Sequence, residues 1–205
     1  MTTVKRVRLA PEERRAQLIA LGLQMLATRP LEELSVEELA DQAGISRGLL
    51  FHYFSSKQEF HLAVATEAAR QMLELTAPDP ALPADQRLVF SLGKMIDYVT
   101  ENSDTYISLV RGAASGDAEL RALFDATRSA HANRILNSAP EFGVTATAEV
   151  ELAVHGWVAF AEEVIVRWLR AGRPNTTSRE QLMQLLANAL FALAGAAGAA
   201  ADVEG

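Results

Sequence analysis

Apolar residues recur every three to four positions along most of the chain, the spacing that places side chains on one face of an α-helix. Clusters of proline, glycine, asparagine and serine interrupt this spacing and separate the elements. Alanine and leucine are abundant and strand signals are nearly absent, so we predict an all-α protein of about nine helices. The expected helices span residues 11–29, 35–43, 47–54, 56–76, 84–101, 104–114, 117–138, 147–171 and 178–201.

Two of these helices are short and flank a tight turn. Ser35 with Glu38 forms a capping-box pattern at the start of the first, and Gly44 ends it. Ser46 can cap the second, so residues 44–46 form the turn of a helix-turn-helix arrangement.

The second of these short helices has two distinct sides when it is rotated by 100° per residue. With Leu50 and Phe54 taken as buried, Gly48 and His52 point away from the core. A glycine there would let the backbone approach a DNA groove closely. The flanking positions can meet phosphates or base edges, with Arg47 and Phe51 on one side and Leu49 and Tyr53 on the other. The alternative is that the two short helices form a hairpin buried against another part of the protein. Burial would not explain why glycine, charged and aromatic residues lie together on the outward side.

The charge is unevenly distributed along the 205 residues. The net charge is −7, yet the first 60 residues carry eight Lys or Arg and eight Asp or Glu, so the rest carries the whole excess. Within the first segment most cations lie outside the acidic run from Glu32 to Asp41. We therefore expect a basic face and an acidic face to coexist there.

Composition excludes several other kinds of protein. The absence of cysteine rules out disulfides and thiolate chemistry and suits the cytoplasm, and the N-terminus carries no secretion signal pattern. Nucleophile-elbow, zinc-protease and phosphate-loop motifs are absent, and the four histidines show no ligand spacing. We expect no enzyme activity, no catalytic residues, no metal and no cofactor.

The segment from Leu34 to Lys57, LSVEELADQAGISRGLLFHYFSSK, resembles the DNA-binding signature of the tetracycline-repressor family of transcriptional regulators. The resemblance covers roughly residues 11–60 and implies an N-terminal three-helix DNA-binding domain, residues 1–57. A larger helical domain for ligand binding and dimerisation, residues 58–205, would follow it. Beyond residue 60 only the number and lengths of the helices agree with the family.

The resemblance also implies roles for individual residues. Ser35 and Lys57 match positions that contact phosphates, and Arg47 and His52 match positions that reach base edges or nearby phosphates. Phe51 lacks the hydroxyl of the usual tyrosine. A basic arm before the first helix either adds phosphate contacts or is a solvated tail. The full set of expected DNA-binding residues is Lys5, Arg6, Arg8, Ser35, Ser46, Arg47, Gly48, Phe51, His52, Tyr53 and Lys57.

The last two helices are the most apolar. The helix over 147–171 is apolar on most sides and requires burial by more than one neighbour. No charged residue lies between Glu180 and Asp202, but three amides and many weakly hydrophobic alanines argue against a membrane span. In the family these two helices form the dimer interface, and this sequence fits that use.

Candidate effector-binding residues lie on the middle helices, although each one is also compatible with ordinary core or surface. They are Phe90, Met95, Tyr98, Tyr106, Phe124, Arg128, His131, His155, Trp157 and Glu162. Glu151, His155 and Glu162 share one stripe of their helix, which would place polar groups in an apolar pocket.

The sequence thus predicts a cytoplasmic homodimer that binds a palindromic DNA operator and leaves it when a small molecule of unknown identity binds. Movement of the helix over residues 56–76 would transmit the signal. Two alternatives remain, namely an activator or a regulator without a small-molecule effector, and a helical adaptor without DNA binding.

Overall fold

The computed structural model describes residues 10–113, 116–171 and 176–201, which form nine α-helices and two short 3₁₀ helices and contain no strand. The elements are α1 (Pro11–Leu26), η1 (Leu31–Glu33), α2 (Val36–Ala43), α3 (Arg47–Tyr53), α4 (Lys57–Leu75), α5 (Ala84–Glu101), α6 (Ser103–Ala113), α7 (Ala118–Ser138), η2 (Ala139–Phe142), α8 (Ala148–Arg170) and α9 (Arg179–Ala201). The all-α class and the helix number confirm the prediction. The main difference is that α1 ends three residues early.

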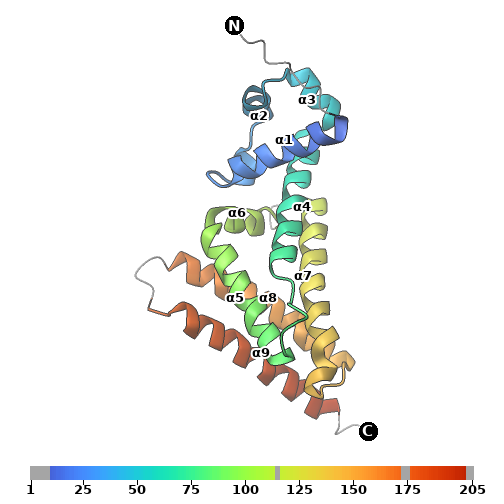
Figure 1. The fold of residues 1–205 in the computed structure, drawn as a ribbon, viewed down its shortest axis with the longest axis vertical. Helices are drawn as coiled ribbons and strands as arrows, with labels where there is room; N and C mark the ends of the chain where they lie inside the picture. Colours follow the sequence, from blue (N-terminus) through green and yellow to red (C-terminus); the bar gives the residue numbers. More distant parts are fainter. Residues whose placement is uncertain (1–9, 114–115, 172–175, 202–205) are drawn as a thin grey trace.

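The helices form two groups along the length of the molecule (Figure 1). Helices α1, α2 and α3 form one end, and α4 leaves this end and runs beside α7 into the larger group. Helices α8 and α9 pack against each other at the opposite end, where α7 and α5 also contact them. Helix α4 therefore connects the two groups.

Caps fix the ends of several helices, including the predicted ones at Ser46 and Gly44. Ser46 Oγ accepts a hydrogen bond from Leu49 N at 3.2 Å, and Gly44 ends α2 with φ of +64°, a conformation that favours glycine. Ser178 and Gln181 form both halves of a capping box at α9. These local hydrogen bonds hold the short helices in place.

The first core holds the helix-turn-helix together. Leu18, Leu39, Leu50, Phe54 and Phe60 are fully buried in it. Burial of this kind fixes α3 on α1 and α4, because isolated helices of this length are marginal in water.

Helices α1 and α4 approach each other closely at Gly22. A Cβ atom at this position would lie 2.6 Å from the side chain of Val64 and 2.8 Å from that of Phe60. Only a glycine fits this crossing without displacing its neighbours.

The second core joins α5, α7, α8 and α9. Trp157 is buried at its centre and donates a hydrogen bond from Nε1 to the carbonyl oxygen of Leu186 at 2.9 Å, which ties α8 to α9. Helix α4 contributes to both cores, since Phe60 and Val64 belong to the first and Met72 to the second.

Among the described residues, one segment is long and apolar enough to cross a membrane by composition alone, Arg179–Gly198 of α9. Leu182, Leu186 and Leu190 of this helix are buried in the second core. We therefore assign α9 to the helical body of the protein rather than to a membrane span.

Candidate nucleic-acid interface and effector cavity

The buried side of α3 anchors it firmly. Leu50 and Phe54 have no exposed surface, and the rings of Phe54 and Phe60 meet edge to face with centroids 5.3 Å apart. The guanidinium of Arg15 lies 4.9 Å from the centre of the Phe54 ring. The helix is thereby held in one orientation, as the predicted burial of Leu50 and Phe54 requires.

The opposite side of α3 faces solvent. Gly48, His52, Leu49 and Phe51 are all exposed, and no atom lies closer than 4.0 Å to the position of a Cβ at Gly48. The Arg47 guanidinium is 5.5 Å from the centre of the Phe51 ring. This arrangement gives a protruding helix whose backbone is accessible along the Gly48 side.

Two of the predicted phosphate-binding cations already have partners within the protein. Arg47 forms an exposed ion pair with Glu37 at 2.9 Å, and Lys57 Nζ donates to the carbonyl oxygen of Glu32 at 2.9 Å. The expected separation of a basic and an acidic face is therefore wrong at this point, because the turn brings the start of α3 back to the start of α2. An exposed pair of this kind is weak because solvent screens it, so a phosphate can replace Glu37 as the partner of Arg47.

The start of α2 differs from the predicted capping box. Ser35 Oγ accepts from Glu38 N at 3.4 Å, but the Glu38 carboxylate pairs with Arg29 at 2.5 Å instead of returning to Ser35. The Ser35 hydroxyl also donates to Glu37 at 3.1 Å. The pKa of Glu37 is lowered by its own backbone N–H and then by this hydroxyl.

The remaining predicted DNA-binding residues have different surroundings. Tyr53 is half-buried, and its ring meets that of His52 with centroids 5.6 Å apart. Lys5, Arg6 and Arg8 lie outside the described residues.

A cavity of about 210 Å³ lies in the second group of helices, with walls from α4 to α9. The wall is mostly apolar. Eight of the ten predicted effector-binding residues line it: Met95, Tyr98, Tyr106, Phe124, Arg128, His131, Trp157 and Glu162.

Two predicted residues, Phe90 and His155, do not line the cavity. The Phe90 ring lies beneath the Lys94 ammonium at 5.5 Å, and His155 is exposed on α8. Glu151 is exposed as well, so of the predicted stripe only Glu162 reaches the cavity. Periodicity places residues on one side of a helix, but it does not show how much of that side faces a cavity.

Arg128 and Glu162 form a two-point ion pair across the wall of the cavity. Arg128 Nε and Nη2 lie 2.9 and 2.5 Å from the two carboxylate oxygens, and the Glu162 side chain is only 15% exposed. The Glu162 carboxylate is the main cause that raises the pKa of Arg128, whereas burial first and then Glu162 raise the pKa of Tyr106 nearby.

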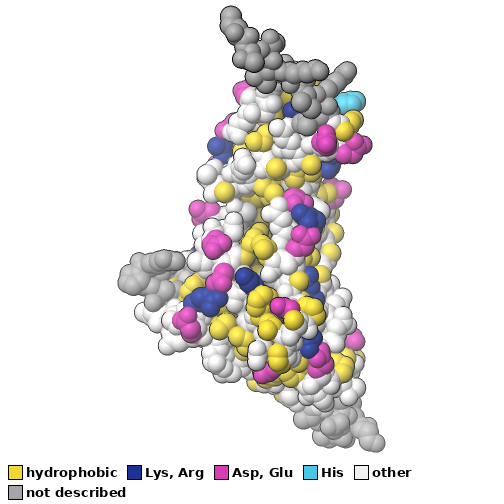
Figure 2. Space-filling model, in the orientation of Figure 1, with side chains coloured by type: hydrophobic (Ala, Val, Ile, Leu, Met, Phe, Trp, Pro, Cys, Tyr) yellow, Lys and Arg dark blue, Asp and Glu magenta, His cyan; other side chains and the backbone are white. Residues whose placement is uncertain are grey.

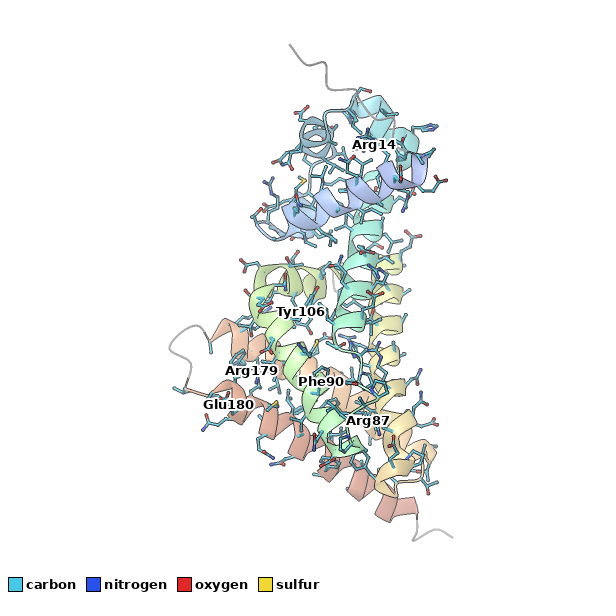
Figure 3. The ribbon with its side chains drawn as sticks, in the orientation of Figure 1. Arg14, Arg87, Phe90, Tyr106, Arg179 and Glu180 are labelled. Atoms are coloured by element: carbon cyan, nitrogen blue, oxygen red, sulfur yellow. The ribbon has the colours of Figure 1, made fainter. Side chains whose placement is uncertain are left out.

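The structure adds polar wall residues that we did not predict, Arg87, Ser91 and Arg134. Buried atoms without a hydrogen-bond partner in the described protein include Arg87 Nε, Ser91 Oγ and His131 Nε2. The spacing of Arg87 and Ser91, one turn apart on an amphipathic helix, was the available signal. Figure 3 shows Arg87 near the start of α5 and Tyr106 on α6, closer to the helix-turn-helix unit.

The outer faces of α8 and α9 expose apolar side chains. Leu152 is 76% exposed on α8, and Phe160, Leu185 and Leu193 are also exposed. Nothing lies within 4 Å of a Cβ built at Gly156, on the same side of α8 as Leu152. The view in Figure 2 shows hydrophobic side chains reaching the surface over the lower part of the molecule.

No group of three His, Asp or Glu side chains suited to a metal ion occurs among the described residues. An outward recognition helix on a helix-turn-helix unit, joined to a helical body that contains a cavity, defines a DNA-binding transcriptional regulator.

Residues 18–64 match the family model "Bacterial regulatory proteins, tetR family", and residues 84–193 match "Tetracyclin repressor-like, C-terminal domain". The second match alone spans more than half of the chain. The protein therefore belongs to the tetR family of bacterial regulators.

Individual relatives are also regulators. The HTH-type transcriptional activator FasR of Mycolicibacterium smegmatis is 26% identical over 175 residues, which cover 82% of this chain and 77% of the relative. The HTH-type transcriptional repressor AcnR of Corynebacterium jeikeium is 33% identical over 79 residues, covering 38% of this chain and 42% of the relative. A tetR-family regulator structure from Streptomyces coelicolor has a TM-score of 0.77 and 32% identity, covering 96% of this chain and 86% of that one. Transcription regulators of this kind are not enzymes.

Proposed function

We propose that this regulator is a repressor that binds a palindromic operator as a homodimer and leaves DNA when a small molecule occupies the cavity. The observation that carries the proposal is the exposed side of α3, where Arg47, Gly48 and His52 face solvent while Leu50 and Phe54 are buried. The division after residue 57 and a cytoplasmic location belong to the same proposal.

DNA binding by α3 follows from its shape and charge. Two copies of the helix about 34 Å apart reach successive major grooves of one duplex face. The exposed Gly48 backbone allows close approach, while Arg47 exchanges Glu37 for a phosphate or base edge.

The operator contacts can be tested through their salt dependence. The Arg47→Gln and Lys57→Gln variants are each expected to weaken operator binding and to reduce the slope of log K against log salt by about one. Arg121→Gln serves as the control, since Arg121 is an exposed cation on α7, away from the recognition helix. Intact protein that never binds sheared genomic DNA would instead support the adaptor alternative.

The homodimer is supported by the exposed apolar side chains of α8 and α9. Burying these side chains against a second copy stabilises the dimer by about 25 cal/mol for each Å² of apolar surface removed from water. The Leu152→Asp variant is expected to be monomeric in sedimentation measurements and to lose high-affinity operator binding. Glu149→Asp, an exposed change near the start of α8, should leave the dimer intact.

Effector control is supported by the cavity, which a regulator without an effector does not need. A small molecule that prefers a conformer with altered spacing of the two recognition helices would release DNA. Near-complete switching requires a preference of about 5.5 kcal/mol. A ligand that changes DNA affinity while the spacing stays constant would contradict this mechanism.

A further inference from the structure

The cavity extends along α7. Its wall follows α7 from Leu123 to Ser138, a path of about 22 Å at 1.5 Å per residue. Its volume of about 210 Å³ corresponds to about seven water volumes. Much of the remaining wall is apolar and includes Leu88, Leu92, Met95, Ile135, Val154 and Trp157. An extended apolar chain of medium length fits this shape.

The polar groups near Thr127 already satisfy one another. Arg128 and Glu162 neutralise each other through two hydrogen bonds, so this end of the cavity offers no unbalanced charge. The charged groups near Ser138 are arranged differently.

Arg134 carries an unbalanced positive charge into that second end. No carboxylate of the described residues forms an ion pair with it, and its recorded hydrogen bond is a long one, 3.4 Å to Thr76 Oγ1. Burial lowers the pKa of this arginine. A half-buried guanidinium beside apolar walls favours an anionic partner, because its own desolvation is otherwise uncompensated.

Unsatisfied polar atoms also line the cavity. Arg87 Nε, Ser91 Oγ and His131 Nε2 are buried and have no partner in the described protein, although the Arg87 terminal group pairs with Glu141. That ion pair joins α5 to η2, and η2 follows α7 directly in the chain. The start of α5 therefore lies beside the end of α7. Each unsatisfied buried group has lost its hydrogen bonds to water without replacement, and a ligand that bonds to it removes that cost.

We propose that the effector is a monocarboxylic acid with an extended apolar tail, and this rests on the proposed effector site. Its carboxylate binds Arg134 and accepts from Ser91 and Arg87 Nε, while the tail follows α7 toward Tyr106. A cationic ligand would be repelled by both arginines, and a neutral alcohol would leave Arg134 unbalanced.

The test measures binding to the DNA-free, full-length protein by calorimetry, with sodium octanoate, octan-1-ol and octylamine as probes. Octanoate is expected to bind at least tenfold more tightly than octanol, and octylamine more weakly still. The Arg134→Gln variant should lose at least tenfold in octanoate affinity while its octanol affinity changes less than twofold. Arg121→Gln, on an exposed position of the same helix, should bind octanoate like the parent.

Equal binding of octanoate and octanol, or an unchanged octanoate affinity in Arg134→Gln, would overturn the proposal. If that variant fails to fold, Ser91→Ala provides the same test, with an expected loss of threefold or more for octanoate alone. If octanoate binds but operator affinity does not change, the proposed effector control is contradicted. The inferred class of ligand is then unaffected. Release of the operator by a neutral or cationic molecule, with no octanoate binding, would contradict only the ligand class.

Discussion

The Thr105 hydroxyl donates a hydrogen bond of 2.9 Å to the carbonyl oxygen of Leu26, across the boundary between the helix-turn-helix unit and the helical body. Ser108 Oγ accepts a second one from the backbone of Leu31 at 2.7 Å. Both partners are on α6, whose Tyr106 also lines the cavity and is labelled in Figure 3. Helix α6 therefore contacts the cavity and the DNA-binding unit directly, in addition to the connecting helix α4.

Loss of the α6 contact should weaken this link. The Thr105→Val variant keeps the side-chain shape but leaves the buried Leu26 carbonyl without its donor, so we expect a loss of about 1–3 kcal/mol in the free energy of unfolding. Urea denaturation measures it. Thr66→Val is the matched control, because the exposed Thr66 hydroxyl binds only a carbonyl of its own helix; its change should stay within about 0.5 kcal/mol. Equal effects in the two variants would contradict a special role for the α6 contact.

Gly48→Ala should separate DNA binding from stability. A Cβ at this position meets no other side chain closely, and alanine favours a helix over glycine by up to about 1 kcal/mol. The variant should therefore be as stable as the parent or more so in thermal unfolding. Operator affinity should fall about tenfold in a gel-shift titration if the backbone approaches the groove here. Unchanged affinity would show that this side of α3 does not lie against DNA.

Gly22→Ala should have the opposite effect on the fold. Its Cβ would collide with Val64 and Phe60, and overpacking of this kind costs about 1–3 kcal/mol, which exceeds the gain in helix propensity. We expect a lower midpoint in urea, with Gly48→Ala as the comparison. A midpoint at or above that of the parent would mean that α1 and α4 can separate freely.

Acid should destabilise the fold through His131. Burial, and to a smaller extent Arg134, lowers the pKa of His131 from 6.5 to about 4, and Arg128 and Arg87 also line the same cavity. The unfolded chain therefore takes up this proton first as the pH falls. The free energy of unfolding should decrease between about pH 6.5 and pH 4, by about 3 kcal/mol in total.

This pH dependence can be assigned by substitution. His131→Gln should flatten the dependence of the urea midpoint on pH over that range, whereas His52→Gln, which removes an exposed histidine, should retain it. Parallel curves for His131→Gln and the parent would exclude His131 as the source.

Local signals were enough to predict the helices and the orientation of α3. Ser46 caps its helix, Gly44 ends the one before it, and Gly48 and His52 are exposed as the 100° rotation predicted. Capping and periodicity act over a few residues, so they can be followed along the chain without knowledge of the neighbours.

Contacts between helices could not be predicted in the same way. The pairing of Arg47 with Glu37 and of Glu38 with Arg29 depends on how α2 turns toward its neighbours. Phe90 and Arg87 are both on α5, yet only Arg87 lines the cavity. Helical spacing does not say which side of α5 faces the cavity.

The sequence by itself determined the helical class, the turn between α2 and α3 and the residues that α3 turns outward. Only the tertiary structure decided that Arg134, Ser91 and His131 line the same cavity and that Thr105 reaches Leu26. The physical reason is the range of the interactions. Caps and helical periodicity are set within one or two turns, whereas a cavity and the charges inside it are set by the packing of helices that lie far apart in the chain.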